Sequence, residues 1–393
     1  MRAAGWVAGG ILSILSALAC ADSVSNPVLG EVPEWKLRRG VAIGSPDDPV
    51  YGLWAPGEVL ADDDRVYVLL VRDATIRVFT RDGVFVRDLG GGRGAGPGEM
   101  MRPGFMGWYG PGTIAIGDGE LRRFTFYEIA TGEAETVPYQ TYLSAAHGTA
   151  ALEPAVALPG RRAANFPLPT DATRGRSIPT TSPMVVLDTV GRVRDTLALL
   201  SMPVEAEITA GVADGGALHI SHPLEQYGLW QFAPDRSRVA IVDRRSWTGT
   251  GPAEFGVTTV DPEGDTLFHR QIAYDPRPVP GGYYDREIAG FLDLPIIMDR
   301  AAFADALRQF FEQIRYLPSV TDLTVGSDRT IWLAGADRDG EREWLVLDPS
   351  GAGIGRFRLP STSSVFYADR NEAWIVERDA LDIPYVVRYE ILP

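Results

Sequence analysis

Residues Val66–Pro103 read VYVLLVRDATIRVFTRDGVFVRDLGGGRGAGPGEMMRP, three short runs of strand-forming residues followed by a connector rich in glycine. The runs lie at 66–71, 76–79 and 84–89. Between the last two, Asp82 and Gly83 are residues that tolerate the positive φ of a tight hairpin. Together with a weaker run at 53–60, these segments predict a four-stranded antiparallel meander, which is the repeating sheet of a β-propeller.

Related hairpins recur along the chain. An apolar run, an Asp near its end and a Gly three residues later are found at 188–191, 261–264 and 348–351. The copies are unevenly spaced, so the sequence has no fixed repeat period. About 370 residues, divided by blades of about 40–60, give six to eight blades, and the hairpin count favours six. We expect the blades near 45–105, 106–140, 141–200, 205–275, 318–360 and 361–393.

A propeller exposes strand edges unless its ring closes. The last strand-forming run is 385–391, and an early one, 35–43, comes before the first blade. We therefore expect the early run to complete the last blade. The expected fold is an all-β, six-bladed β-propeller that occupies residues 34–393 as a single domain.

One α-helix interrupts the pattern between the late blades, within an insertion at about 282–317. Asp299 is a suitable N-cap, and Pro318 ends the segment. Its apolar residues repeat with the helical period, namely Phe303, Leu307, Phe310, Phe311 and Ile314. Such an insertion either shapes a binding pocket or covers exposed strand edges.

The N-terminus has the pattern of an export signal. Arg2 precedes an apolar run at 5–18, which is too short to span a membrane. The run leads to Cys20, and the pattern resembles a bacterial lipoprotein signal, in which this cysteine receives the lipid. Ala17 stands where that signal more often has leucine, so the alternative is an ordinary signal peptide cut near residue 19 or 21. Residues 1–20 are then the signal and 21–33 a flexible tether.

Composition excludes several kinds of chemistry. The net charge of −15 disfavours a phosphate backbone, so nucleic acid is not an expected partner. Cys20 is the one cysteine, so a lipidated chain has no disulfide and no thiolate site. Lys36 is the one lysine, which leaves no Schiff-base lysine beyond it.

The glycine-rich connector, residues 92–99 (GRGAGPGE), is not a phosphate-binding loop, because neither a helix nor a Lys-Ser/Thr pair follows it. It resembles the connector of six-bladed β-propeller lipoproteins related to NHL-repeat proteins, with Met100 where an aromatic residue is usual. This resemblance implies fold and export rather than activity. Arg93 and Glu99 either stabilise the loop or contact a ligand.

No residue pattern specifies a catalytic or metal site. His219 and His222 are three residues apart, and on a strand they face opposite sides. The run 62–64 (DDD) lacks the spacing of an EF-hand and predicts a solvated turn. We assign no catalytic, binding or metal residue and no cofactor. Propeller lactonases bind Ca²⁺ near the central channel through Asp, Glu and Asn, so Ca²⁺ stays open.

These observations favour an exported propeller, lipid-anchored at Cys20 and facing the periplasm or the cell surface. We expect a monomer that serves as a binding or scaffold module for a peptide, glycan or protein partner in the cell envelope. The alternative is a metal-dependent hydrolase or lyase with its site at the central channel. A third candidate is a structural subunit of an envelope complex. We expect function to lie in the irregular parts, 145–183 and 281–318.

Overall fold

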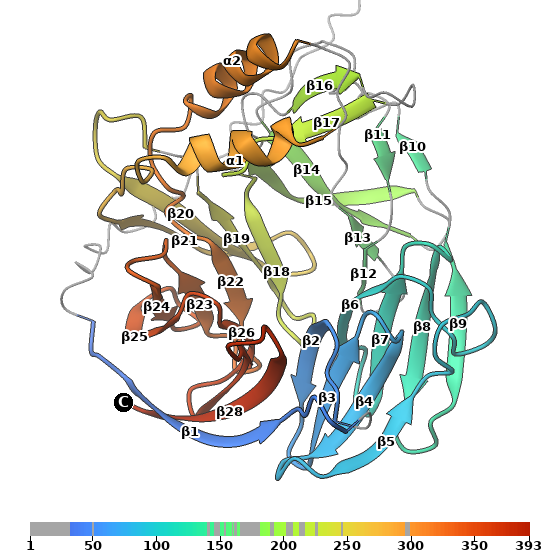
Figure 1. Ribbon diagram of the computed structural model, residues 1–393. Helices are drawn as coiled ribbons and strands as arrows, with labels where there is room; N and C mark the ends of the chain where they lie inside the picture. Colours follow the sequence, from blue (N-terminus) through green and yellow to red (C-terminus); the bar gives the residue numbers. More distant parts are fainter. Residues whose placement is uncertain are drawn as a thin grey trace, which may run out of the picture.

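Six four-stranded antiparallel sheets make up most of the chain and fan out around a common centre (Figure 1). This computed structural model is an all-β propeller with two helices. The structure describes residues 32–393 except 49–50, 140–141, 145–149, 153–154, 159, 161–162, 166–180, 189–191, 202–206, 212–216, 225–226, 245–246 and 295–298.

The first three sheets follow the chain order. The first contains β2 (Pro56–Ala61), β3 (Arg65–Leu70), β4 (Thr75–Thr80) and β5 (Phe85–Leu89). The second contains β6 (Pro103–Trp108), β7 (Thr113–Asp118), β8 (Arg123–Glu128) and β9 (Ala134–Pro138). The third contains β12 (Val156–Ala157), β13 (Ala163–Asn165), β14 (Thr181–Leu187) and β15 (Val193–Ser201).

The other three sheets complete the ring. The fourth contains β18 (Leu229–Phe232), β19 (Val239–Asp243), β20 (Glu254–Val260) and β21 (Thr266–Ala273). The fifth contains β22 (Asp322–Val325), β23 (Ile331–Ala334), β24 (Glu341–Leu347) and β25 (Gly353–Pro360). The sixth contains β26 (Ser364–Ala368), β27 (Glu372–Arg378), β28 (Pro384–Leu392) and β1 (Lys36–Ile43). Two separate hairpins pair β10 (Tyr142–Ser144) with β11 (Ala150–Leu152) and β16 (Glu207–Gly211) with β17 (Ala217–Ser221).

Five of the six sheets are regular blades, in which every strand has at least four residues. The third sheet differs, because β12 has two residues and β13 has three. The inner strands β6, β2, β26, β22 and β18 contact one another in that order, whereas β12 contacts β7. The count of regular blades is therefore five and not the expected six, because the third sheet begins with strands too short to build a full inner edge.

Alternating side chains join each sheet to its two neighbours. Val66–Leu70, part of the first strand-forming run of the opening stretch, is fully buried. Its even-numbered members pack with Trp374 of the sixth sheet, and its odd-numbered members pack with Ile114 of the second. Because side chains of a strand alternate between faces, each of these apolar strands belongs to two cores.

Aspartate-stabilised turns recur at the outer hairpins. Oδ1 of Asp348 accepts hydrogen bonds from the amides of residues 350 and 352, and Gly351 has a φ of 85°. Asp261 repeats the arrangement. The sequence pattern missed a further copy at Asp379, because Asp382, with a φ of 63°, takes the place of the expected glycine.

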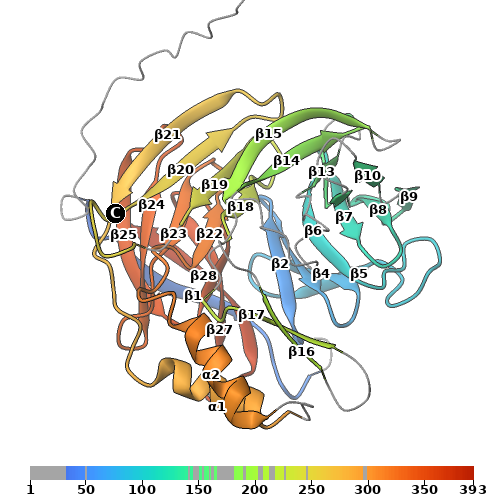
Figure 2. The same cartoon turned by 90° about the horizontal axis from the view of Figure 1, so that it is seen from above.

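Two segments, one before and one after the fourth sheet in the chain, form a separate small core, which we call the cap. It consists of β16, β17, α1 (Tyr283–Leu292) and α2 (Arg300–Phe311), packed around Phe303 and Phe311. Figure 2 shows these elements together on one side of the ring. Residues 207–221 were expected in the fourth blade, and α1 was not expected. No helix in the described ranges is long and apolar enough to cross a membrane.

The predicted helix and its cap residue are confirmed. The side chain of Asp299 accepts a hydrogen bond from the amide of Ala302, at 2.9 Å. Phe303, as expected, lies on the buried face of α2. Ile314 lies beyond the last helical residue.

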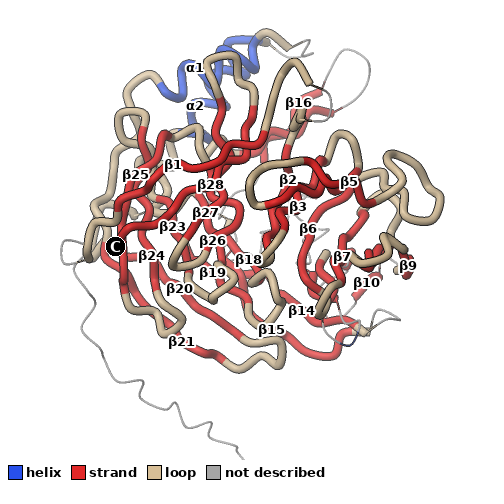
Figure 3. Tube along the Cα trace, turned by 90° about the horizontal axis from the view of Figure 1, so that it is seen from below, coloured by secondary structure: helices blue, strands red, loops and turns tan. Residues whose placement is uncertain are grey.

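The predicted closure of the ring is also confirmed. β1 pairs antiparallel with β28 from Lys36–Leu392 to Ile43–Val386 (Figure 3). Trp35, just before β1, lies edge-on to Trp332 of the fifth sheet at 6.0 Å. A Cβ at Gly355 would meet the Trp35 ring, so the glycine leaves the space that the ring fills. The first and last parts of the described chain therefore share one sheet.

Deleting residues 34–44 removes this closure. Burial of Trp35 and Ile43 each contributes about 2 kcal/mol, before any loss from the unpaired β28 edge. For a chain of this size, we expect the melting temperature to fall by roughly 5 °C or more in a calorimetric scan. The matched control deletes residues 21–31, and equal melting temperatures for the two deletions would contradict the closure.

Candidate functional site

A cavity of about 430 Å³ lies at the centre of the ring and is lined by the inner strand of every sheet. We call this cavity the channel. Three charged residues line it, Glu58 from β2, Arg236 from the turn between β18 and β19, and Asp322 at the start of β22. The rest of its lining is mainly apolar and aromatic. The channel therefore has the composition of a small-molecule site, apolar with a few convergent polar groups.

Irregular backbone in β2 and β6 builds one wall of the channel. The pairing register shifts between Pro56 and Glu58 in β2, and between Gly104 and Gly107 in β6. Within the second irregularity, Phe105 has a φ of 56°, in the left-handed region that bulky residues seldom occupy. Bulges of this kind redirect side chains and amides, and backbone strain gathers at functional sites.

The bulge turns backbone donors toward Glu58. The amides of Phe105 and Met106 donate to its carboxylate. Burial nevertheless raises the pKa of Glu58 to about 7, against the opposing effects of the Arg236 charge and the two amides. The side chain keeps some contact with the channel while protein encloses it. Glu58 therefore changes charge near neutral pH.

Arg236 is fixed on the other side of the bulge. Its side chain is 5% exposed, and Nη2 donates to the carbonyl oxygen of Phe105 at 2.9 Å. The guanidinium lies on Gly107, where a Cβ would come within 2.5 Å of three of its atoms. Its Nε has no hydrogen-bond partner, and in the described part of the chain no carboxylate forms an ion pair with it. Burial lowers its pKa to about 10, although Glu58 and Asp235 oppose the shift.

The short third sheet explains why Arg236 reaches this position. Because β12 has only two residues, the turn between β18 and β19 lies against β6 instead. The amide of Trp108 donates to the carbonyl oxygen of Pro234 at 2.8 Å. Phe105 stacks on Trp230 with ring centroids 5.6 Å apart and planes at 10°. The second and fourth sheets therefore meet at the channel.

This contact leaves an aromatic surface in the channel. Phe105 is 43% exposed, although it is a large apolar residue. Trp230 is held at its other side by Phe232, edge-on at 6.1 Å. An exposed ring with a strained backbone and a fixed neighbour is a preorganised contact surface for a flat ligand.

Asp322, at the start of β22, is the third charged residue of the channel. Burial raises its pKa, and the charges of Arg342 and Arg244 oppose the shift. Ser364 is also a hydrogen-bond partner of the Asp322 side chain. Asp322 is therefore more fully compensated than Arg236.

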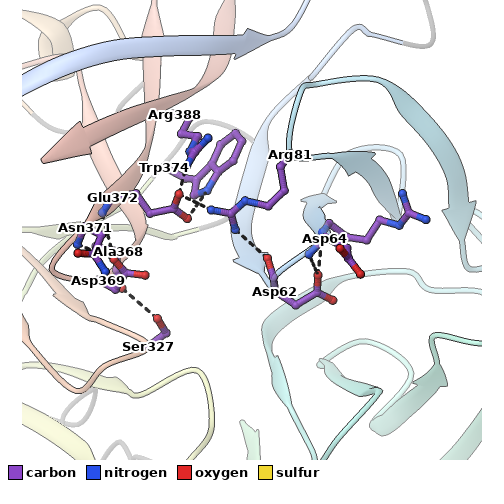
Figure 4. Close-up of polar contacts among 11 residues, drawn as sticks. Asp62, Asp64, Arg81, Ser327, Ala368, Asp369, Asn371, Glu372, Trp374 and Arg388 are labelled. Carbon is purple, nitrogen blue, oxygen red and sulfur yellow. Dashed lines mark hydrogen bonds and ion pairs between the residues drawn. The ribbon is translucent and has the colours of Figure 1, made fainter.

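A second polar cluster joins the first and sixth sheets (Figure 4). Glu372 is 6% exposed and forms ion pairs with Arg81 and, at 2.7 Å, with Arg388. Arg81 also donates to the carbonyl oxygen of Asp62 at 2.7 Å. Trp374 donates to the same glutamate at 3.3 Å. Because its charges are paired, this cluster stabilises the junction between sheets.

The residues 62–64, expected to form a turn, do so. Oδ1 of Asp62 accepts from the amides of Asp64 and Arg65, and Oδ2 accepts from the Tyr67 hydroxyl. The structure therefore gives Asp62 a role in holding the turn before β3.

Arg93 and Glu99 stabilise the glycine connector, which was one of the two roles expected for them; the other was contact with a ligand. Glu99 accepts a hydrogen bond from the amide of Gly96 at 2.6 Å. Arg93 donates to the carbonyl oxygens of Arg72 and Met101. Both residues bind backbone of the loop and its surroundings, which is a structural role.

The histidines do not gather into a described site. His222 is buried in the cap, where Nε2 lies 2.9 Å from the carbonyl oxygen of Phe311 and Nδ1 accepts from the amide of Leu224. Burial lowers the pKa of His222. The His219 side chain and Cys20 lie outside the described residues. Among the residues that the structure describes, no group of three or more His, Cys, Asp or Glu is placed to hold a metal ion.

The sequence offered only weak signals for the channel residues. Pro56 and Gly57 weakened the first strand of the meander, and this is where the β2 irregularity places Glu58. Two glycines around Phe105 and Met106 likewise mark the β6 irregularity. We expected function in the irregular segments 145–183 and 281–318. Most of the first segment lies outside the described residues, and the second contains the two helices of the cap.

Replacing Gly107 with alanine tests the position of Arg236. The new Cβ would collide with the guanidinium, and such overpacking costs about 1–3 kcal/mol. Gly104→Ala is the matched control in the same strand, where a Cβ meets nothing within 4 Å, so we expect a change within about 0.5 kcal/mol. Denaturant titration measures both. Equal stabilities for the two variants would contradict the packing described.

Comparison with known proteins finds only distant structural likenesses. No family model and no curated protein matches the chain. A member of the DUF4221 family from Bacteroides vulgatus is similar, with 11% identity over 91% of this chain and 98% of its own, at a TM-score of 0.49. A protein from Bacteroides fragilis described as exported has 10% identity over 92% and 98%, at 0.47. Virginiamycin B lyase from Staphylococcus aureus has 10% identity over 91% and 99%, at 0.40. These likenesses carry no argument about fold or function, and the NHL-repeat-like lipoprotein family stays a prediction.

Proposed function

We propose that this chain is an exported, lipid-anchored binding protein whose ligand occupies the channel. One observation carries the proposal, namely that Glu58, Arg236 and the exposed ring of Phe105 converge on a single cavity through irregular backbone. Polar groups left with spare hydrogen-bonding capacity in an apolar cavity are typical of ligand sites. The cavity volume of about 430 Å³ favours a small molecule, or a side chain of a peptide or glycan, over a folded protein surface.

The third sheet is, in this proposal, a degenerate sixth blade. It lies between the second and fourth sheets, since β12 contacts β7 and β15 contacts β19. Val156 of β12 also contributes to the channel lining. A ring of six blades, one of which has a short inner strand, explains why six sheets form. It also explains why Phe105 is exposed where the second and fourth sheets meet.

An acid–base enzyme is the second candidate. A carboxyl group with a pKa of about 7 exchanges protons readily at neutral pH, which suits a general acid or base. In that case Glu58→Gln abolishes turnover of a bound compound while its binding persists. The metal-dependent form of this hypothesis, including the Ca²⁺ left open by the sequence, has no residues assigned to it.

Screening a small-molecule library against the whole exported chain tests the binding function. We expect some compounds to raise the melting temperature, since saturation at about 100 times Kd adds about 2.7 kcal/mol. The shift should vanish in Phe105→Leu or change strongly in Glu58→Gln. It should persist in Glu120→Gln, an exposed carboxylate of the second sheet. Compounds that bind both channel variants as they bind the native chain, or no binding compound at all, would overturn the proposal.

Replacing Cys20 with serine tests the anchor. The native chain, expressed in a bacterium, should sediment with membranes and partition into detergent, because the lipid supplies the attachment. Cys20→Ser should release the protein into the soluble envelope fraction. A native chain that is already soluble after export would instead indicate an ordinary signal peptide.

A further inference from the structure

We infer that the ligand of the channel is a small planar molecule carrying a carboxylate, which lies beside Arg236 with its flat apolar part against Phe105. This inference rests on the proposed binding function and names the chemical class that the channel recognises.

The channel wall holds a cation that no ion pair balances among the described residues. Arg236 is buried, yet no carboxylate of the described residues forms an ion pair with it, and its Nε lacks a partner. Asp235, its neighbour in the chain, lies 3.7 Å from Arg329. A buried cation without an ion pair is costly, even with the Phe105 carbonyl and the charges of Glu58 and Asp235 nearby, and a bound anion lowers that cost.

The carboxyl group that faces this cation also favours a bound anion. Glu58 becomes increasingly protonated, and so neutral, as the pH falls below its pKa of about 7, which burial raises. Its hydroxyl is then a second donor toward an anion, beside the guanidinium. Above that pH the ionised Glu58 repels the anion and partly balances Arg236 itself. Affinity for a carboxylate should therefore fall as the pH rises through 7.

The other charges around the channel do not reverse this preference. Asp322, on β22, has Arg342 and Arg244 as compensating charges. The described channel linings on β6, β12 and β26 carry no charged side chain. Arg236 is consequently the cation of the channel, and Glu58 is the group that titrates against it.

The wall of the channel beside this cation is flat. Phe105 and Trp230 stack nearly parallel, so an exposed face of this pair offers a flat surface close to the guanidinium. The cavity of about 430 Å³ has room for a ring system with a short polar substituent. A planar carboxylate satisfies both the charge and the surface.

Calorimetric titration of the whole exported chain tests the inference with benzoate, 4-hydroxybenzoate and indole-3-carboxylate. The corresponding carboxamides are neutral controls of nearly the same shape. At constant ionic strength we expect a carboxylate to bind at least about tenfold more tightly than its amide at about pH 5.5, and to lose about tenfold by about pH 8.5.

Three variants sharpen the result. Arg236→Gln should reduce carboxylate affinity by about tenfold or more, whereas Arg329→Gln, exposed and nearby, should leave it unchanged. Glu58→Gln should keep the affinity of the acidic range up to about pH 8.5, because a neutral amide replaces the titrating group. If Arg236→Gln fails to fold, Glu58→Gln still tests the inference. It should bind a carboxylate more tightly than the native chain does at high pH.

The outcomes separate the inference from the proposed function. If amides or cationic library compounds bind in a Phe105-dependent way at least as tightly as the carboxylates, the inference is wrong and the binding function stands. If carboxylate affinity does not depend on pH in the native chain, the role given to Glu58 is wrong. If no compound of any charge binds, both the inference and the binding function fall.

Discussion

The pairing of β1 with β28 is the interaction on which the rest of the structure depends. It joins the first described strand to the last in one sheet, and so fixes the circumference of the ring. Each sheet buries its two faces against its neighbours, as the alternate side chains of β3 show. Because the circumference is fixed, the neighbouring sheets cannot spread to fill the space that a sheet with a short inner strand leaves. The missing inner strand therefore leaves its gap at the centre of the ring.

The third sheet creates that gap, and the channel is its consequence. The short β12 lets the turn between β18 and β19 reach β6, where the amide of Trp108 binds Pro234 and the guanidinium of Arg236 binds Phe105. The backbone of β6 accommodates this contact through its irregularity and the positive φ of Phe105. The same irregularity directs two amides to Glu58. One local shortening thus explains the strained residue, the buried cation and the titrating carboxyl group together.

Much of the fold could be predicted from the sequence because local chemistry specifies it. The Asp299 cap, the Gly83 hairpin and the apolar strand Val66–Leu70 depend on near neighbours in the chain, and the structure confirms them. Ring closure followed from the need to cover edges. The regular blade count did not follow, because strands of two and three residues in the third sheet leave little trace in the sequence.

The candidate site could not be predicted for a related reason. Glu58 and Arg236 are far apart in the chain, and each appears in the sequence as an ordinary charged residue of a turn or strand end. Their properties come from burial and from the contact between the second and fourth sheets. In the sequence, only the glycines and the proline of the two irregular strands indicated that these positions were unusual. Asp379 was missed for a simpler reason, since the sequence rule demanded glycine where Asp382 also adopts a positive φ.

The pKa of Glu58 in the native protein tests the account most directly. Carbon-13 NMR of carboxyl-labelled glutamate, with Glu58→Gln used to assign the resonance, reports its titration without any ligand. Burial, which outweighs the opposing effects of the two amides and the nearby guanidinium, predicts a midpoint of about 7. A midpoint near the ordinary value of 4.5 would contradict the claim that burial dominates the pKa of Glu58.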